Sequence, residues 1–146
     1  MASGTFAWYG SAFAKAFNKE IDWNDGNTKF AFSSSSYTPD NDAHDYFNDV
    51  TNEVTGTNWS AGGVTLSNCS ISIDTSNNRV RFFADDIAQA TVTATGFRVG
   101  VIYSNTGTAA TSPLIGYITF DGDMSPNAGT QTVDFDGTNG IGRVTY

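Results

Sequence analysis

The stretch FRVGVIY, from Phe97 to Tyr103, decides the fold class that this sequence predicts. Apolar residues stand at every second position from Phe97 to Tyr103, which is the period of a β-strand. The positions between them include Gly100 and Ile102, so the second face is largely small or apolar too. Because strands that are covered on both faces have this composition, we expect FRVGVIY to be a central strand of a sheet.

Short segments with strand character flank this stretch at nearly even spacing, and Gly, Asn, Asp and Pro separate them. They are residues 28–32, 64–73, 79–84, 89–95, 114–120, 132–136 and 141–146. The apolar residues change parity between Leu66 and Cys69, which predicts a bulge or bend there. About eight such strands predict an all-β fold, an antiparallel β-sandwich or jelly-roll-like architecture, with residues 1–146 as a single domain.

One segment near the N-terminus, YGSAFAKAFNK (residues 9–19), has the period of a helix instead. Its expected apolar face consists of Tyr9, Gly10, Phe13, Ala16 and Phe17. Lys15 falls elsewhere on the helical wheel. So short a helix cannot bury its own apolar face, so we expect residues 1–20 to form an N-terminal segment whose helix packs on a sheet or on another subunit.

A second short helix is predicted from Asp40 to Val50. Thr38 suits its N-cap and Pro39 suits its first turn. Its small apolar face would consist of Tyr46, Phe47 and Val50.

Composition limits the classes of partner. Charged residues make up only 15% of the 146 residues, and the polar-neutral remainder is typical of secreted or virion β-proteins. The net charge is −8 and the seven basic residues are scattered, so we expect no nucleic-acid partner. No apolar run is long enough to span a membrane and no signal sequence is evident, so we expect synthesis in a reducing cytoplasm and no membrane partner. The single cysteine, Cys69, is expected to be a small buried residue.

Catalytic and metal-binding residues were sought among the His, Cys and acidic side chains. The only histidine, His44, has no nucleophile or orienting partner in a recognisable pattern. Acidic residues cluster at Asp40, Asp42 and Asp45, at Asp85 and Asp86, at Asp121 and Asp123, and at Asp134 and Asp136. None of these clusters follows a calcium-loop pattern, and Asp is common in turns, so we expect them to stabilise turns. The sequence therefore predicts no enzyme, no catalytic residue, no cofactor and no metal site.

Several aromatic residues outside the regular strands could bind a partner. They are Trp8, Tyr9, Trp23, Tyr37 and Trp59. A carbohydrate-binding module that stacks sugars on Trp59 and Tyr103 is one interpretation. Packing within the fold or at a subunit contact is the alternative that aromatic residues more often serve.

Three segments carry a resemblance to a known family. They are YGSAFAKAFNKEIDW (residues 9–23), SSSSYTPDNDAHDYFNDVTNEVTGTNWSAGGVTL (residues 33–66) and VIYSNTGTAATSPLIGYITFDGD (residues 101–123). Together they resemble a family of small virion proteins of tailed bacteriophages, over nearly the whole chain. The SYTPD and AGG segments are the most specific part. The chain departs from the family pattern at Phe30 and Phe32, where smaller aliphatic residues are expected, and in the extra serines from Ser33 to Ser36.

The resemblance implies a capsid decoration (cement) protein that binds the outer surface of the capsid and stabilises contacts between capsomers. It implies the major capsid protein as partner, a homo-oligomer with a trimer favoured, and a location on the virion surface. The expected contact residues are Phe6, Trp8, Tyr9, Phe13 and Phe17. The alternative is a tail, head–tail or receptor-binding component of the virion.

Overall fold

The computed structural model describes residues 3–146, and these form an all-β fold of antiparallel sheets, as the sequence predicts. The strands are β1 (Gly4–Trp8), β2 (Thr28–Ser33), β3 (Val64–Thr65), β4 (Ser70–Asp74), β5 (Arg79–Phe83), β6 (Ile87–Val92), β7 (Phe97–Ser104), β8 (Leu114–Met124), β9 (Gly129–Val133) and β10 (Gly142–Thr145). The helical elements are α1 (Ala12–Phe17) and two 3₁₀ turns, η1 (Phe47–Asp49) and η2 (Ala109–Thr111).

The largest sheet has five strands in the order β1-β8-β7-β2-β3. The predicted central strand FRVGVIY is β7, and it lies in the middle of this sheet. Both faces of β7 are covered. Phe97 and Ile102 belong to the main core, whereas Val99 and Val101 pack on the opposite face with Tyr37 and other buried residues. The scarcity of polar residues in FRVGVIY is thus explained by its double cover.

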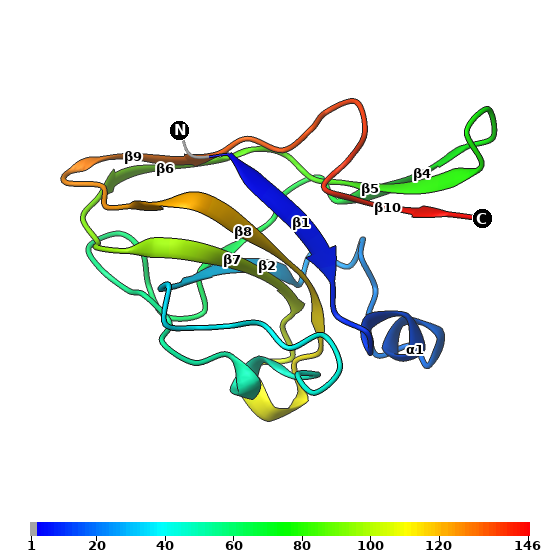
Figure 1. Ribbon diagram of the computed structural model, residues 1–146, viewed down its shortest axis with the longest axis horizontal. Helices are drawn as coiled ribbons and strands as arrows, with labels where there is room; N and C mark the ends of the chain where they lie inside the picture. Colours follow the sequence, from blue (N-terminus) through cyan, green and yellow to red (C-terminus); the bar gives the residue numbers. More distant parts are fainter. Residues whose placement is uncertain (1–2) are drawn as a thin grey trace.

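A second layer faces the main core and makes the molecule sandwich-like (Figure 1). It consists of the pair β6-β9 and a three-stranded sheet in the order β10-β5-β4. The three-stranded sheet, here called the wing, projects beyond the five-stranded sheet at one end of the molecule, with α1 beside it (Figure 1). The predicted bend between Leu66 and Cys69 is confirmed, since β3 ends before it, β4 begins after it, and Asn68 between them has a φ of 52°.

The main core is rich in aromatic rings. Phe32 stacks on Phe97 with ring centroids 4.3 Å apart, and both side chains are fully buried. Phe30 occupies the space above Gly100, where a Cβ atom would overlap its ring. The glycine in the central strand therefore makes room for a large ring on the neighbouring strand, which accounts for Phe30 where a smaller residue is expected.

The two predicted helices differ from those in the structure. The helix spans Ala12–Phe17, shorter than residues 9–19, because the residues before Tyr9 pair with β8 as strand β1. The predicted helix from Asp40 to Val50 is wrong. Asp40 instead accepts hydrogen bonds from the N–H groups of Asp42 and Ala43 in a turn, and only η1 is helical. Asp and Asn side chains compete for backbone groups in this way and favour turns over helix.

Candidate functional site

All large apolar side chains that are exposed in residues 3–146 belong to α1 and the wing. They are Phe13 (36% exposed), Phe17 (88%), Ile71 (46%), Ile73 (65%) and Tyr146 (66%). We call these five residues the wing patch. Apolar side chains scattered singly over a surface are ordinary, but a group confined to one region marks an interaction site.

The pairing of the wing strands puts the patch on one face. Ile71 lies opposite Phe82, and Ile73 lies opposite Val80, so these four side chains share a face. Val144 on β10 lies opposite Val80 and extends the same face. Tyr146 continues this alternation, and its N–H donates to the Asn78 carbonyl. The face toward α1 is thus apolar across all three strands of the wing.

A groove separates α1 from the wing and joins the two parts of the patch. It has a cavity volume of about 110 Å³, and all nine side chains that line it are apolar. Phe13 borders it from the helix and Ile71 from the wing. Trp8 supports it from below, with ring centroids 5.1 Å from Phe13 and 5.0 Å from Phe82. Two residues of the patch, Phe13 and Ile71, therefore flank one groove above an aromatic base.

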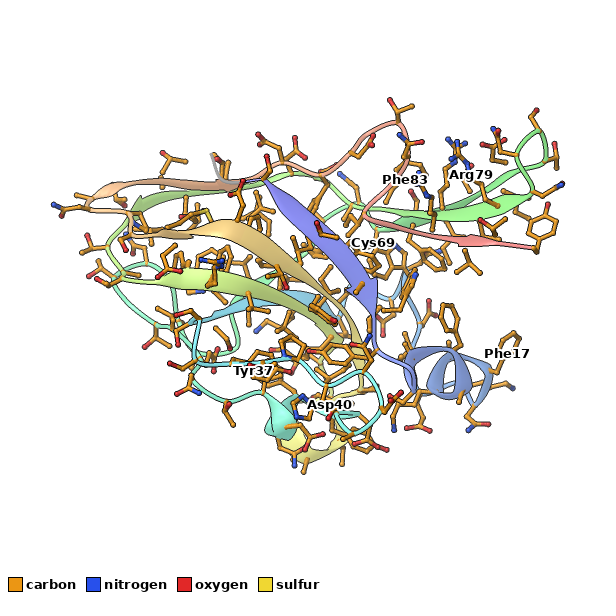
Figure 2. All side chains as sticks on the ribbon, viewed as in Figure 1. Phe17, Tyr37, Asp40, Cys69, Arg79 and Phe83 are labelled. Carbon is orange, nitrogen blue, oxygen red and sulfur yellow. The ribbon has the colours of Figure 1, made fainter. Side chains whose placement is uncertain are left out.

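The orientation of α1 differs from the expected one in two side chains. Lys15 is 8% exposed, whereas Phe17 is 88% exposed and is directed away from the body in Figure 2, and Phe13 lies between them at the groove. The Lys15 ammonium lies 3.6 Å from carboxylate oxygens of both Glu20 and Asp45, and 3.5 Å from the ring centroid of Tyr46. These contacts replace water around a buried ammonium group and fix the helix with its phenylalanines in solvent.

The five expected contact residues fall into three environments. Tyr9 is fully buried, and its hydroxyl lies 2.8 Å from that of Tyr37. Phe6 and Trp8 are partly buried against the main core. Phe13 and Phe17 alone present substantial surface. Their role as subunit or capsid contacts stays a prediction.

Ile71, Ile73 and Tyr146 were missed as site residues by sequence reasoning. Their alternation in SISID and in IGRVTY was visible as strand character. What could not be read was which face of these strands lacks a covering layer, since that depends on where the wing projects from the body.

The opposite face of the wing is basic. Arg79, Arg81 and Arg143 are three of the seven basic residues of the chain, and the wing strands hold one of its fifteen acidic residues, Asp74. Asp74 accepts a hydrogen bond from Arg79 Nε at 2.9 Å. The side chains of Asn77 and Arg79 hold the pKa of Asp74 below its usual value. Figure 2 shows Arg79 on the side of the wing away from Phe17.

His44 takes part in a structural network. Its Nδ1 accepts a hydrogen bond from the Asp40 N–H at 3.2 Å and lies 3.1 Å from the Tyr37 hydroxyl. Burial, with the hydroxyl contact to Tyr37, raises the pKa of Tyr9. These contacts fix the 37–44 loop over the five-stranded sheet. In residues 3–146, no three His, Cys, Asp or Glu side chains are grouped to hold a metal ion.

The sugar-stacking interpretation lacks accessible rings. Trp59 is fully buried, Tyr103 is 2% exposed and Trp23 is 5% exposed. Cys69 is only partly buried, less than expected, and desolvation followed by the charges of Asp25 and Asp85 raises the pKa of its thiol.

Comparison with known proteins finds no match: no family model, no curated protein and no solved structure resembles this chain significantly. Within residues 3–146, the helices are all too short or too polar to cross a bilayer.

Proposed function

We propose that the chain is a structural protein of a bacteriophage virion, a capsid decoration protein that binds the major capsid protein through the wing patch. The observation that supports this most is the confinement of every exposed large apolar side chain of residues 3–146 to α1 and the wing. An adhesive protein needs such a surface on a rigid frame, and the family resemblance supplies the virion context.

The binding mechanism relies on a surface that forms only in the assembled shell. Each copy spans neighbouring capsomers, so the free energy of binding adds to the stability of the lattice. Many copies act together, and a trimer contributes several contacts at once. The arginines behind the patch favour an acidic docking surface, which would speed association at low ionic strength.

The test uses purified protein and expanded empty shells of the major capsid protein encoded in the same genome. Deleting residues 1–20 is unsuitable, because it removes β1 from the five-stranded sheet. We would instead compare the wild type with the double variant Phe17→Ser, Ile73→Ser. The control is Thr119→Ser, at an exposed position of β8.

Co-sedimentation with the shells gives the readout. The wild type and Thr119→Ser should bind, and the double variant should bind at least about tenfold more weakly, as expected when contact residues are truncated. Decorated shells should also resist heat and osmotic shock better than bare shells. Equal binding by the double variant would refute the wing patch as the contact. No binding by the wild type, or labelling of tails instead of heads, would refute the decoration assignment.

A further inference from the structure

The outer edge of β1 has backbone groups that no other strand uses. β1 pairs with β8 on one side only. The Tyr9 N–H donates to the Ile115 carbonyl at 3.2 Å, and the Asp121 N–H donates to the Ser3 carbonyl at 2.9 Å. Since antiparallel pairing alternates, the odd-numbered residues of this strand bond to β8 and Gly4, Phe6 and Trp8 face outward.

A groove runs along this edge. Two adjoining hollows, of about 340 and 470 Å³, share Gly4 and Phe6 as one bank and Gly140 and Ile141 as the other. Segment 134–141, between β9 and β10, passes beside β1 in Figure 1. The outward N–H and C=O groups of β1 therefore face a hollow with a second wall.

β1 also lacks the features that usually prevent an edge strand from pairing with another chain. β1 has the sequence GTFAW, without a charge or a proline. Among the other edges, β3 has only two residues, β6 is irregular at Thr91 with a φ of 54°, and β4 and β10 carry Asp74 and Arg143, whereas β9 (GTQTV) is uncharged like β1. Short length, irregularity and charge are the usual protections of a sheet edge.

The charges in the groove are uneven. Asp134 lines only the hollow beside Ser3 and Gly4, Asp136 lines both hollows, and Arg143 lines only the hollow that reaches Trp8. A ligand that runs the length of the edge would meet only carboxylates at the Gly4 end, and Arg143 beside Asp136 at the Trp8 end. Complementary charges at both ends would fix its direction.

We propose that the β1 edge binds an extended segment of a partner polypeptide, which adds a sixth strand to the five-stranded sheet and places a basic side chain near Asp134 and Asp136. The backbone of the segment bonds to Gly4, Phe6 and Trp8, as in other cases of strand addition. This site goes beyond the proposed function and does not use the wing patch.

The first experiment selects ligands from a displayed library of random peptides of roughly ten residues, about the length of a long strand. The full chain serves as bait, and amide hydrogen exchange is measured with each selected peptide. We expect enriched peptides with a basic residue near one end, and slower exchange at Gly4, Phe6 and Trp8. Enriched peptides that leave these three amides unprotected, or no enrichment at all, would overturn the proposal.

The second experiment uses variants that keep the fold. Thr5→Lys adds a positive charge to an exposed position of β1, and Thr65→Lys adds the same charge to an exposed position at the opposite edge of the same sheet. Thr5→Lys should lower the affinity for the selected peptides, and Thr65→Lys should not. Asp134→Asn should lower this affinity about two- to fivefold, the effect of losing an exposed ion pair. Equal affinities for all three proteins would contradict the placement. Shell binding tested in parallel keeps this outcome separate from that of the proposed function.

Discussion

The five-stranded sheet with its covering layers, here called the body, and the wing both consist of antiparallel strands. They differ in how far their apolar side chains are buried. In the body both faces of the five-stranded sheet are covered, and Phe32, Trp59 and Phe97 are fully buried. In the wing one face has an apolar side chain on each strand, yet Ile71 and Ile73 remain about half or more exposed. Residue type therefore does not decide burial here. The position of a strand relative to the second layer does.

The largest loss of stability is expected from a substitution in the body. Phe32→Ala removes a ring that stacks on Phe97 and contacts Phe30 and Trp59. We expect it to lower the free energy of unfolding by about 3–5 kcal/mol, since a large buried ring leaves a cavity. Urea denaturation followed by tryptophan fluorescence measures this. A loss below about 1 kcal/mol would mean that the aromatic core does not dominate stability.

Lys15 tests the contact that orients α1. Lys15→Met removes the ion pairs to Glu20 and Asp45 and should lower the free energy of unfolding by about 1–2 kcal/mol. The matched variant Lys19→Met changes an exposed lysine and should stay within about 0.5 kcal/mol of the wild type. If the two variants unfold alike, the buried ammonium does not hold the helix.

Acid should loosen the loop beside the five-stranded sheet. Partial burial raises the pKa of Asp49, but hydrogen bonds from the N–H groups of Asp45 and Tyr46 outweigh it and hold this pKa below its usual value. A carboxyl with a lowered folded-state pKa stabilises the fold above its unfolded pKa and loses that contribution as pH falls through the folded value.

We therefore expect the Tm of the wild type to fall between about pH 5 and about pH 2. Asp49→Asn should have a lower Tm at neutral pH and a flatter profile, measured by differential scanning calorimetry. Asp134→Asn, on an exposed residue, serves as the control. Parallel profiles for the wild type and Asp49→Asn would contradict the assigned role.

The backbone at the end of α1 offers a small stabilisation. Lys19 has a φ of 64°, and its N–H donates to the Ala16 carbonyl while the Glu20 N–H donates to the Lys15 carbonyl. This is the helix ending at which glycine is preferred. Lys19→Gly should raise the free energy of unfolding by about 0.5 kcal/mol, after the entropy of glycine in the unfolded chain offsets part of the gain. Thermal unfolding would show it, and a lower Tm would refute it.

The smallest effect on stability is expected in the wing patch itself. Phe17→Ser and Ile73→Ser should each change the free energy of unfolding by less than about 0.5 kcal/mol, because both side chains are already largely in water. Chemical denaturation of the single variants measures this. A loss near that of Phe32→Ala would show that the patch is covered in the isolated protein.

The sequence was sufficient for the fold class and the central strand, since the apolar alternation of FRVGVIY, with small or apolar residues between, is typical of a strand covered on both faces. The bend before Cys69 followed from the change of apolar parity. Strand β1 was not foreseen, because GTFAW is short and uncharged and offers no turn signal.

Only part of the candidate site could be predicted from the sequence. Phe13 and Phe17 were identified as contact residues on a helix that packs on a sheet or on another subunit, but the burial of Lys15 was not predicted. Tertiary partners decide this orientation, since Glu20, Asp45 and Tyr46 come together around Lys15 only in the folded chain. No local pattern encodes a contact between residues so far apart in sequence.

Trp8 connects the two surfaces. Its ring supports the groove between α1 and the wing, its indole N–H donates to the Arg143 carbonyl, and its main chain faces the outer edge of β1. If a ligand that binds this main chain also changes the position of the ring, occupancy of either place would alter the affinity of the other by the same factor. One tryptophan would then couple binding at the β1 edge to binding at the wing patch.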